Sequence, residues 1–169
     1  MELAKGIVKT EAREQAAIGE AIRDEEVFFR RVLPGSNHYT RTPDGIRISS
    51  QAFADRNFEP SVDRRALIEY LSLGGPAFTQ GEPANGVLRI QARDVRGVEF
   101  THSPAKQQPE SYKADIHPWP LENNPTHCVI RLQPTTDKAS VFKKLLERLA
   151  LLAKWQIHPR DLAETGDRP

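Results

Sequence analysis

The chain of 169 residues has one cysteine, one methionine and only 7% aromatic residues. Because Cys128 has no second cysteine to pair with, an intramolecular disulfide is excluded and a reducing compartment such as the cytoplasm is favoured. No apolar run approaches the roughly 20 residues of a membrane-spanning helix, and residues 1–13 lack the apolar segment of a signal peptide. We therefore expect a soluble, cytoplasmic protein that does not contact a membrane.

An excess of charge of one sign is also missing, since 24 lysines and arginines stand against 23 aspartates and glutamates. The composition thus provides no broad field that would attract nucleic acid or an anionic membrane. The feature that favours nucleic-acid binding is the presence of local arginine-rich segments. A hydrophobic share of 38% in a chain of this length suits a single domain with a modest core.

The strong sequence signatures of catalysis are absent as well. The chain has no glycine-rich phosphate-binding loop, no HExxH, no CxxC and no GxSxG motif. His102, His117 and His127 lie close in sequence, next to Asp115 and Cys128, and could form a metal site or supply a general base. The alternative is that they are ordinary loop and strand-edge residues, because chemistry needs a convergence that spacing alone does not supply. We predict no metal and no cofactor.

Turn residues separate several β-branched or alternating segments, which predicts a sheet. We expect strands at residues 27–33 and 127–132, and a half-exposed strand at 86–92. Apolar residues at helical spacing from Val141 to Trp155 predict an amphipathic C-terminal helix. The expected fold is α+β, with one small mixed or antiparallel sheet packed by this helix and with an N-terminal helical extension.

Residues 1–26 are rich in helix-forming Ala, Glu, Lys and Arg. The large apolar residues of this segment are Leu3, Ile7, Ile18 and Ile22. So thin a stripe suits either a peripheral helix or an arm that completes its burial on a protein partner or on a second copy of the chain. We expect an extension or interaction arm at 1–26, one α+β domain at 27–157 and a tail at 158–169.

Hydroxyls and arginines are concentrated in residues 47–65. Ser49 and Ser50 follow a short expected strand, and Phe53 is expected to anchor the loop in the core. Ser61 is expected to cap a helix. If arginines such as Arg47 and Arg64 converge beside that helix N-terminus, the site could hold a phosphate or carboxylate. The alternative is that the serines are turn and cap residues and the arginines are solvated.

Trp119 stands between two prolines in the segment HPWPLENNP. A proline-held tryptophan can form a lid over the core, or it can be an exposed recognition aromatic that anchors an interface. Both interpretations remain open, and Trp119 joins Arg31, Arg47 and Arg64 as a candidate binding residue.

Two hypotheses for the function follow. The first is a small binding or accessory module that acts with a larger protein partner in a multi-component bacterial system, with no catalytic residue. The second is a small enzyme acting on a nucleotide or nucleic acid, nuclease-like or ADP-ribosyltransferase-like. In it Arg31 and Arg47 hold a phosphate, Ser49 or Ser50 positions the substrate, and His127 is the acid or base. An arginine on the first strand followed by Ser-Ser resembles ADP-ribosyltransferase layouts, but no glutamate stands at the expected third position.

The segments FFRRVLP, RISSQAFADR, SVDRRAL, NGVLRIQARDVR and NNPTHCVI occur in this order before the amphipathic helix. This order resembles a family of short uncharacterised bacterial proteins. Those proteins run from an aromatic-Arg-Arg start through Ser-Ser-x-Ala-Phe and Ser-Val-Asp to Asn-Pro-x-His. The resemblance spans residues 28–152 and implies that residues 1–26 extend a shared core. It implies no particular activity.

Overall fold

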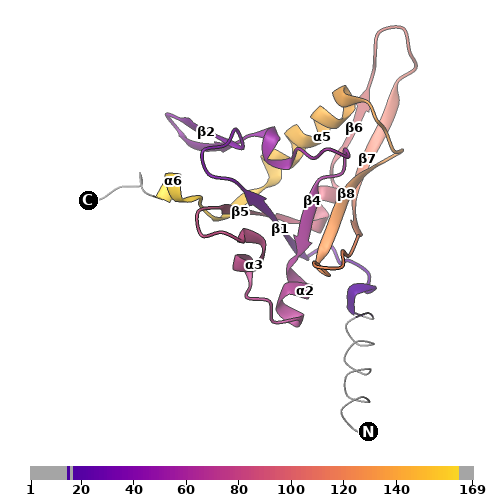
Figure 1. The fold of residues 1–169 in the computed structure, drawn as a ribbon. Helices are drawn as coiled ribbons and strands as arrows, with labels where there is room; N and C mark the ends of the chain where they lie inside the picture. The colour runs from indigo at the N-terminus through magenta and orange to yellow at the C-terminus, as the bar shows by residue number, and fades with distance from the viewer. Residues whose placement is uncertain (1–14, 16, 164–169) are drawn as a thin grey trace.

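The computed structural model describes residue 15 and residues 17–163. Its main element is a seven-stranded sheet in which all neighbouring strands are antiparallel (Figure 1). In spatial order the strands are β6 (Glu99–His102), β7 (Glu110–Pro118), β8 (His127–Gln133), β4 (Ser61–Arg64), β1 (Val27–Val32), β5 (Gly86–Gln91) and β9 (Lys154–Ile157). A separate hairpin pairs β2 (Tyr39–Thr42) with β3 (Gly45–Ile48). The predicted α+β class is confirmed.

Beyond residue 20, six helical elements accompany the sheet in the described part of the chain. They are the 3₁₀ helix η1 (Ser50–Phe53), α2 (Arg65–Tyr70), α3 (Pro76–Gln80), α4 (Ala92–Arg96), α5 (Ala139–Leu152) and α6 (Arg160–Ala163). Within residues 15 and 17–163, every helix is too short or too polar to span a bilayer.

The two faces of the sheet carry separate apolar clusters because successive side chains of a strand point to opposite faces. On β1, Phe28 belongs to the main core, whereas Phe29 belongs to a smaller cluster with Ile68 of α2 and Val87 of β5. Figure 1 shows α5 on one side of β1 and β5 and the pair α2 and α3 on the other. We call these two sides the α5 face and the cleft face.

The main core fills the α5 face. Apolar residues of α5 recur at helical spacing, and five of them are buried in this cluster: Val141, Phe142, Leu145, Leu146 and Leu149. Phe53 of η1 is also fully buried there, as the sequence predicts. The charged residues Lys143, Glu147 and Arg148 are exposed on the other side of the same helix.

One expectation about the sheet is wrong. The C-terminal helix ends at Leu152, and Trp155 lies instead in β9, paired with Leu88 of β5. The open edge of β5 offers backbone hydrogen bonds that outweigh the helical spacing of one further aromatic residue. Strand β5 shows the expected alternation from Leu88 to Gln91, with Arg89 exposed, but α2 and α3 cover the first part of its second face and bury Val87.

The expected helix start at Ser61 is wrong as well. Residues Ser61–Arg64 form β4, which lies between β1 and β8, and α2 begins only at Arg65 without a side-chain cap. Pairing on both sides satisfies the backbone groups of β4, and this tertiary gain overrides the local capping signal. Asp63 therefore lies on a strand of the central sheet and not in the first turn of a helix.

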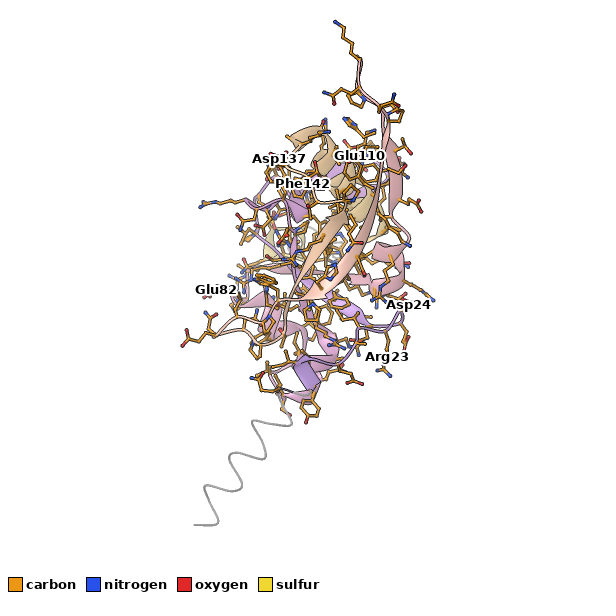
Figure 2. The ribbon with its side chains drawn as sticks, turned by 90° about the vertical axis from the view of Figure 1, so that its right-hand side faces the viewer. Arg23, Asp24, Glu82, Glu110, Asp137 and Phe142 are labelled. Atoms are coloured by element: carbon orange, nitrogen blue, oxygen red, sulfur yellow. The ribbon has the colours of Figure 1, made fainter. Side chains whose placement is uncertain are left out.

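Residues 20–26 are fixed to the domain by two arginines, Arg64 of β4 and Arg96 of α4. Arg64 is 2% exposed and donates to the Glu26 carboxylate at 2.6 and 2.8 Å, and to the carbonyl of Glu20 at 2.9 Å. Arg96 bonds to Asp24 and donates to the carbonyl oxygen of Ile22. Figure 2 shows Arg23 and Asp24 toward one end of the molecule and Glu110 and Asp137 toward the other. Most of the predicted helical extension, residues 1–14 and 16, lies outside the described residues.

Candidate functional site: a polar cleft over three central strands

A cleft of about 380 Å³ lies on the cleft face over β1, β4 and β8. Strand register places Phe29, Asp63 and His127 in one row across the three strands. The polar and charged residues that line the cleft are Arg30, Arg31, His38, Ser61, Asp63, Thr79, Asn124 and His127, and Leu33 is an exposed apolar residue at its wall. Because α2 and α3 cover only part of this face, polar side chains of the central strands remain accessible from one side.

Thr79 of α3 connects the guanidinium and the carboxylate of the cleft. Its carbonyl oxygen accepts a hydrogen bond from Arg31 Nε at 2.7 Å, and its hydroxyl donates to Asp63 Oδ2 at 2.7 Å. The second oxygen of Asp63 accepts from Asn124 Nδ2 at 2.8 Å. Asn124 is itself held by Thr126, whose N–H and hydroxyl both donate to Asn124 Oδ1. The floor of the cleft is thus arranged before any ligand arrives.

His127 has a defined tautomer when it is neutral. Its Nδ1 lies 2.7 Å from the carbonyl oxygen of Trp119, which can only accept a hydrogen bond. The proton therefore sits on Nδ1, and Nε2 keeps its lone pair. His38 also lines the cleft, where burial and the nearby charge of Arg30 lower its pKa below the ordinary value. His38 is therefore uncharged at neutral pH.

The hydroxyl groups at the cleft already serve as donors to carboxylates. Thr79 donates to Asp63, and Ser61 donates to Asp55 Oδ2 at 3.0 Å. Neither hydroxyl therefore donates to the imidazole of His127, as an activated nucleophile would need to. The arrangement is suited to binding a polar group rather than to attacking one.

The structure separates the residues that the enzyme hypothesis needs together. Arg31 and His127 line the cleft, whereas Arg47, Ser49 and Ser50 line a different groove of about 680 Å³. That groove lies between the β2–β3 hairpin and α5. The oxygen Oγ of Ser49 accepts from the N–H of Gln51 at 3.2 Å and so caps η1. Since general acid–base groups act within hydrogen-bond reach, His127 is not placed to act as acid or base on a substrate held by these serines.

Arg64, another candidate binding residue, is not available to a ligand. It is buried in the ion pair with Glu26, and its remaining donors meet carbonyl oxygens at the end of the N-terminal segment. Burial raises the pKa of Glu26, but the hydrogen bonds and charges of Arg64 and Arg23 bring it below its ordinary value of 4.5. Arg64 fastens the N-terminal segment to the sheet.

Trp119 is 50% exposed and belongs to neither buried cluster, so it is not a lid over the core. Its backbone N–H donates to the carbonyl oxygen of His127 at 3.0 Å, and its carbonyl accepts from the His127 ring. The guanidinium of Arg131 lies 4.5 Å from the ring centre. Arg131 in turn donates to both carboxylate oxygens of Glu59, at 2.6 and 3.3 Å.

The other histidines do not gather around a cation. His102 Nε2 lies 3.4 Å from Ser140 Oγ, and His117 pairs across the strands with Val129. Among the residues that the structure describes, no three His, Cys, Asp or Glu side chains are grouped as a metal site requires. Cys128 is buried on the α5 face, and burial raises the pKa of its thiol to about 12.

Sequence reasoning missed three residues of the cleft: Asp63, Thr79 and Asn124. Asp63 had a local explanation as a helix N-terminal residue, and the other two lie in segments that read as polar loops. Asp63 and Asn124 are 61 positions apart in the sequence. No pattern within a single segment indicates so distant a contact.

Comparison of the chain with protein-family models, with curated proteins and with solved structures finds no match. The resemblance to short bacterial proteins therefore stays a prediction.

Proposed function

We propose that this chain is a small cytoplasmic accessory module of a multi-component bacterial system, and that it binds a larger protein partner through Trp119 and the adjoining cleft. The observation that carries the proposal is that Trp119 is half-exposed and yet held in place on several sides.

Trp119 is held by its neighbours in sequence and in space. Pro118 and Pro120 restrict the backbone on either side, and two hydrogen bonds join Trp119 to His127. Arg131 stacks on the ring and is itself held by Glu59. An aromatic side chain that is already ordered loses little conformational entropy on binding, which favours affinity.

The surroundings of Trp119 have the composition of a protein interface. Leu121 is 43% exposed in the same loop, and Leu33 at the wall of the cleft is 49% exposed. Tryptophan and arginine are enriched among the residues that dominate binding energies, and a polar floor beside apolar side chains is usual in such interfaces. The N-terminal helical extension, predicted from the pattern of residues 1–26, is a second contact in this proposal.

The test compares two variants with the unaltered full-length chain. Trp119→Ala removes the aromatic anchor, and Leu151→Ala removes a leucine that is 74% exposed on α5, beside the other groove. Tagged proteins are purified from native cells under identical conditions, and co-purifying proteins are quantified by mass spectrometry. We expect a partner that is retained by the unaltered chain and by Leu151→Ala but lost with Trp119→Ala. Identical protein sets for all three chains would refute the proposal.

A further inference from the structure

Arg31 differs from the other arginines on the three strands beneath the cleft. These strands carry four arginines: Arg30, Arg31, Arg64 and Arg131. Arg30, Arg64 and Arg131 each form an ion pair, and their carboxylate partners are Asp55, Glu26 and Glu59. Arg31 has no carboxylate partner among the described residues. Its hydrogen bond runs from Nε to the carbonyl oxygen of Thr79, which leaves the terminal nitrogens Nη1 and Nη2 as donors for a ligand.

The guanidinium of Arg31 is nevertheless well positioned. The bond to Thr79 fixes Nε, and the group packs against Gly81, whose φ of +69° favours glycine. A Cβ at position 81 would lie 3.1 Å from Nη2 and 3.2 Å from Cζ, closer than ordinary van der Waals contact. The absence of a side chain at position 81 therefore provides the space that the guanidinium occupies. A cation fixed in this way binds an oxyanion with little loss of side-chain freedom.

The charges in the cleft favour a ligand with one negative charge. Arg31 contributes one unpaired positive charge, and Asp63 contributes a negative charge on the neighbouring strand of the same cleft. A carboxylate would be matched by the guanidinium alone. The other arginine that lines the cleft, Arg30, is already paired with Asp55 at 3.7 Å, so the second charge of a phosphate would meet no unpaired cation there and would be repelled by Asp63.

The wall of the cleft adds an apolar requirement. Leu33 follows Arg31 by two residues, lines the same cleft and is half-exposed. A ligand that reaches the guanidinium therefore passes an apolar side chain that burial would stabilise. A peptide with an acidic residue and a neighbouring apolar residue satisfies both requirements.

Building on the proposed partner binding, we propose that Arg31 receives the side-chain carboxylate of an aspartate or glutamate in an acidic segment of the partner, while an apolar side chain of that segment packs on Leu33. The terminal nitrogens Nη1 and Nη2 donate to the two carboxylate oxygens. The segment enters from the side on which Trp119 and Leu121 are exposed, so one partner contacts both the anchor and the cleft.

The experiment uses a random-peptide display library selected against the immobilised full-length chain. We expect the selected peptides to be enriched in aspartate or glutamate beside an apolar residue. A selected peptide is then titrated in solution by fluorescence anisotropy. Replacing its acidic residue with the corresponding amide should weaken binding roughly tenfold or more, a factor that corresponds to about 1.4 kcal/mol. This change alters the peptide alone and leaves the fold of the protein untouched.

Variants of the protein complete the test. Arg31→Gln should weaken binding of the acidic peptide by the same factor and should not weaken binding of the amide peptide further, because the two changes remove one interaction. Arg31→Lys keeps the charge but loses the paired donors, so its affinity for the acidic peptide should lie between those of the unaltered chain and Arg31→Gln. The matched control is Arg47→Gln, which alters an exposed arginine in the other groove and should leave the affinity unchanged. Circular dichroism verifies that each variant is folded.

Three results would overturn the assignment: no selected peptide, selected peptides without acidic enrichment, or an affinity that does not change in Arg31→Gln. Displacement of the peptide by inorganic phosphate at lower concentration than by acetate would also overturn it, since the site would then prefer a dianion. The partner experiment separates the two proposals. If Trp119→Ala loses the partner and Arg31→Gln keeps it, partner binding stands and the carboxylate assignment fails.

Discussion

The α5 face and the cleft face use the same three strands in opposite ways. Neighbouring residues of one strand point to different faces, so the side chains of Arg31 and Arg30 leave β1 on different sides. Arg31 bonds to Thr79 of α3, whereas Arg30 lines the cleft at its edge and bonds to the carbonyl oxygens of Ala52 and Ala54 at η1. On the α5 face, polar groups are paired or buried and α5 covers the apolar residues. On the cleft face, a prearranged set of polar groups stays open. One face therefore stabilises the fold, and the other is open to bind.

The largest expected effect comes from the buried ion pair at the end of the α5 face. Arg64→Gln leaves the carboxylate of Glu26, which is 4% exposed, without its partner. Removing one member of a buried pair costs about 3–5 kcal/mol, because the remaining charge is desolvated without compensation. The free energy of unfolding from urea titration at neutral pH measures this loss. A loss below about 1 kcal/mol would contradict the structural role given to Arg64.

The same pair predicts how stability depends on pH. The pKa of Glu26 is lower in the folded protein than its ordinary value of 4.5, so the folded state binds its proton less readily. The contribution of Glu26 is therefore fully present above pH 4.5 and is lost as the pH falls through the folded pKa. In Glu26→Gln, this part of the acid-induced loss of stability should disappear. An unchanged acid limb in the urea titrations would contradict the prediction.

The next effect tests the core of the α5 face. Leu145→Ala removes a fully buried side chain of α5 and should lower the free energy of unfolding by about 2–5 kcal/mol. Leu151→Ala, on the exposed side of the same helix, should change it by no more than about 0.5 kcal/mol. Equal effects in urea titration would show that α5 does not pack as described.

A smaller effect distinguishes the two adjacent arginines of β1. Arg30 donates to the carbonyl oxygens of Ala52, Ala54 and Ser61, so Arg30→Gln should cost about 2–3 kcal/mol of stability. Arg31→Gln loses one hydrogen bond at the open cleft and should cost about 1 kcal/mol or less. The unfolding free energies of the two variants test this ranking, and the reverse order would break the assignment of the two faces.

The last prediction compares the reactivity of thiols at two neighbouring positions of β8, 127 and 128. Cys128 faces the core, and burial raises the pKa of its thiol to about 12, so thiolate is scarce at pH 8. We expect a disulfide reagent to modify native Cys128 at least roughly 100-fold more slowly than the new thiol of His127→Cys in a Cys128→Ser background. Both thiols should react at similar rates in urea. Equal rates in the native proteins would place both residues on the same face.

Much of the fold follows from local patterns. The strands at β1 and β8, the helical repeat of α5 and the core position of Phe53 are set by short-range alternation and spacing, which a single segment contains. The errors occur where a distant strand supplied hydrogen bonds. The segment that begins at Ser61 forms strand β4 because β1 and β8 pair with it on either side. Trp155 lies in β9 because the edge of β5 offers hydrogen bonds there.

The candidate site was predictable only in part. Arg31, His127 and Trp119 stood out by residue type, and the structure places all three at or beside the cleft. Arg47, Ser49 and Ser50 stood out equally, yet they line the other groove, and Arg64 is buried with Glu26. Residue type indicates what a side chain can do, whereas partners distant in sequence determine whether it is free to do it.

The sequence by itself determined which segments alternate, where the chain turns, and that arginines and hydroxyls are abundant around residues 47–65. Only the tertiary structure decided which of the four arginines on β1, β4 and β8 keeps unused donors. Arg30, Arg64 and Arg131 meet carboxylates brought from 25, 38 and 72 positions away, whereas Arg31 meets a carbonyl oxygen beside a glycine. The physical reason is that ion pairing depends on distance in space, and the pairing of antiparallel strands sets that distance for residues far apart in the chain.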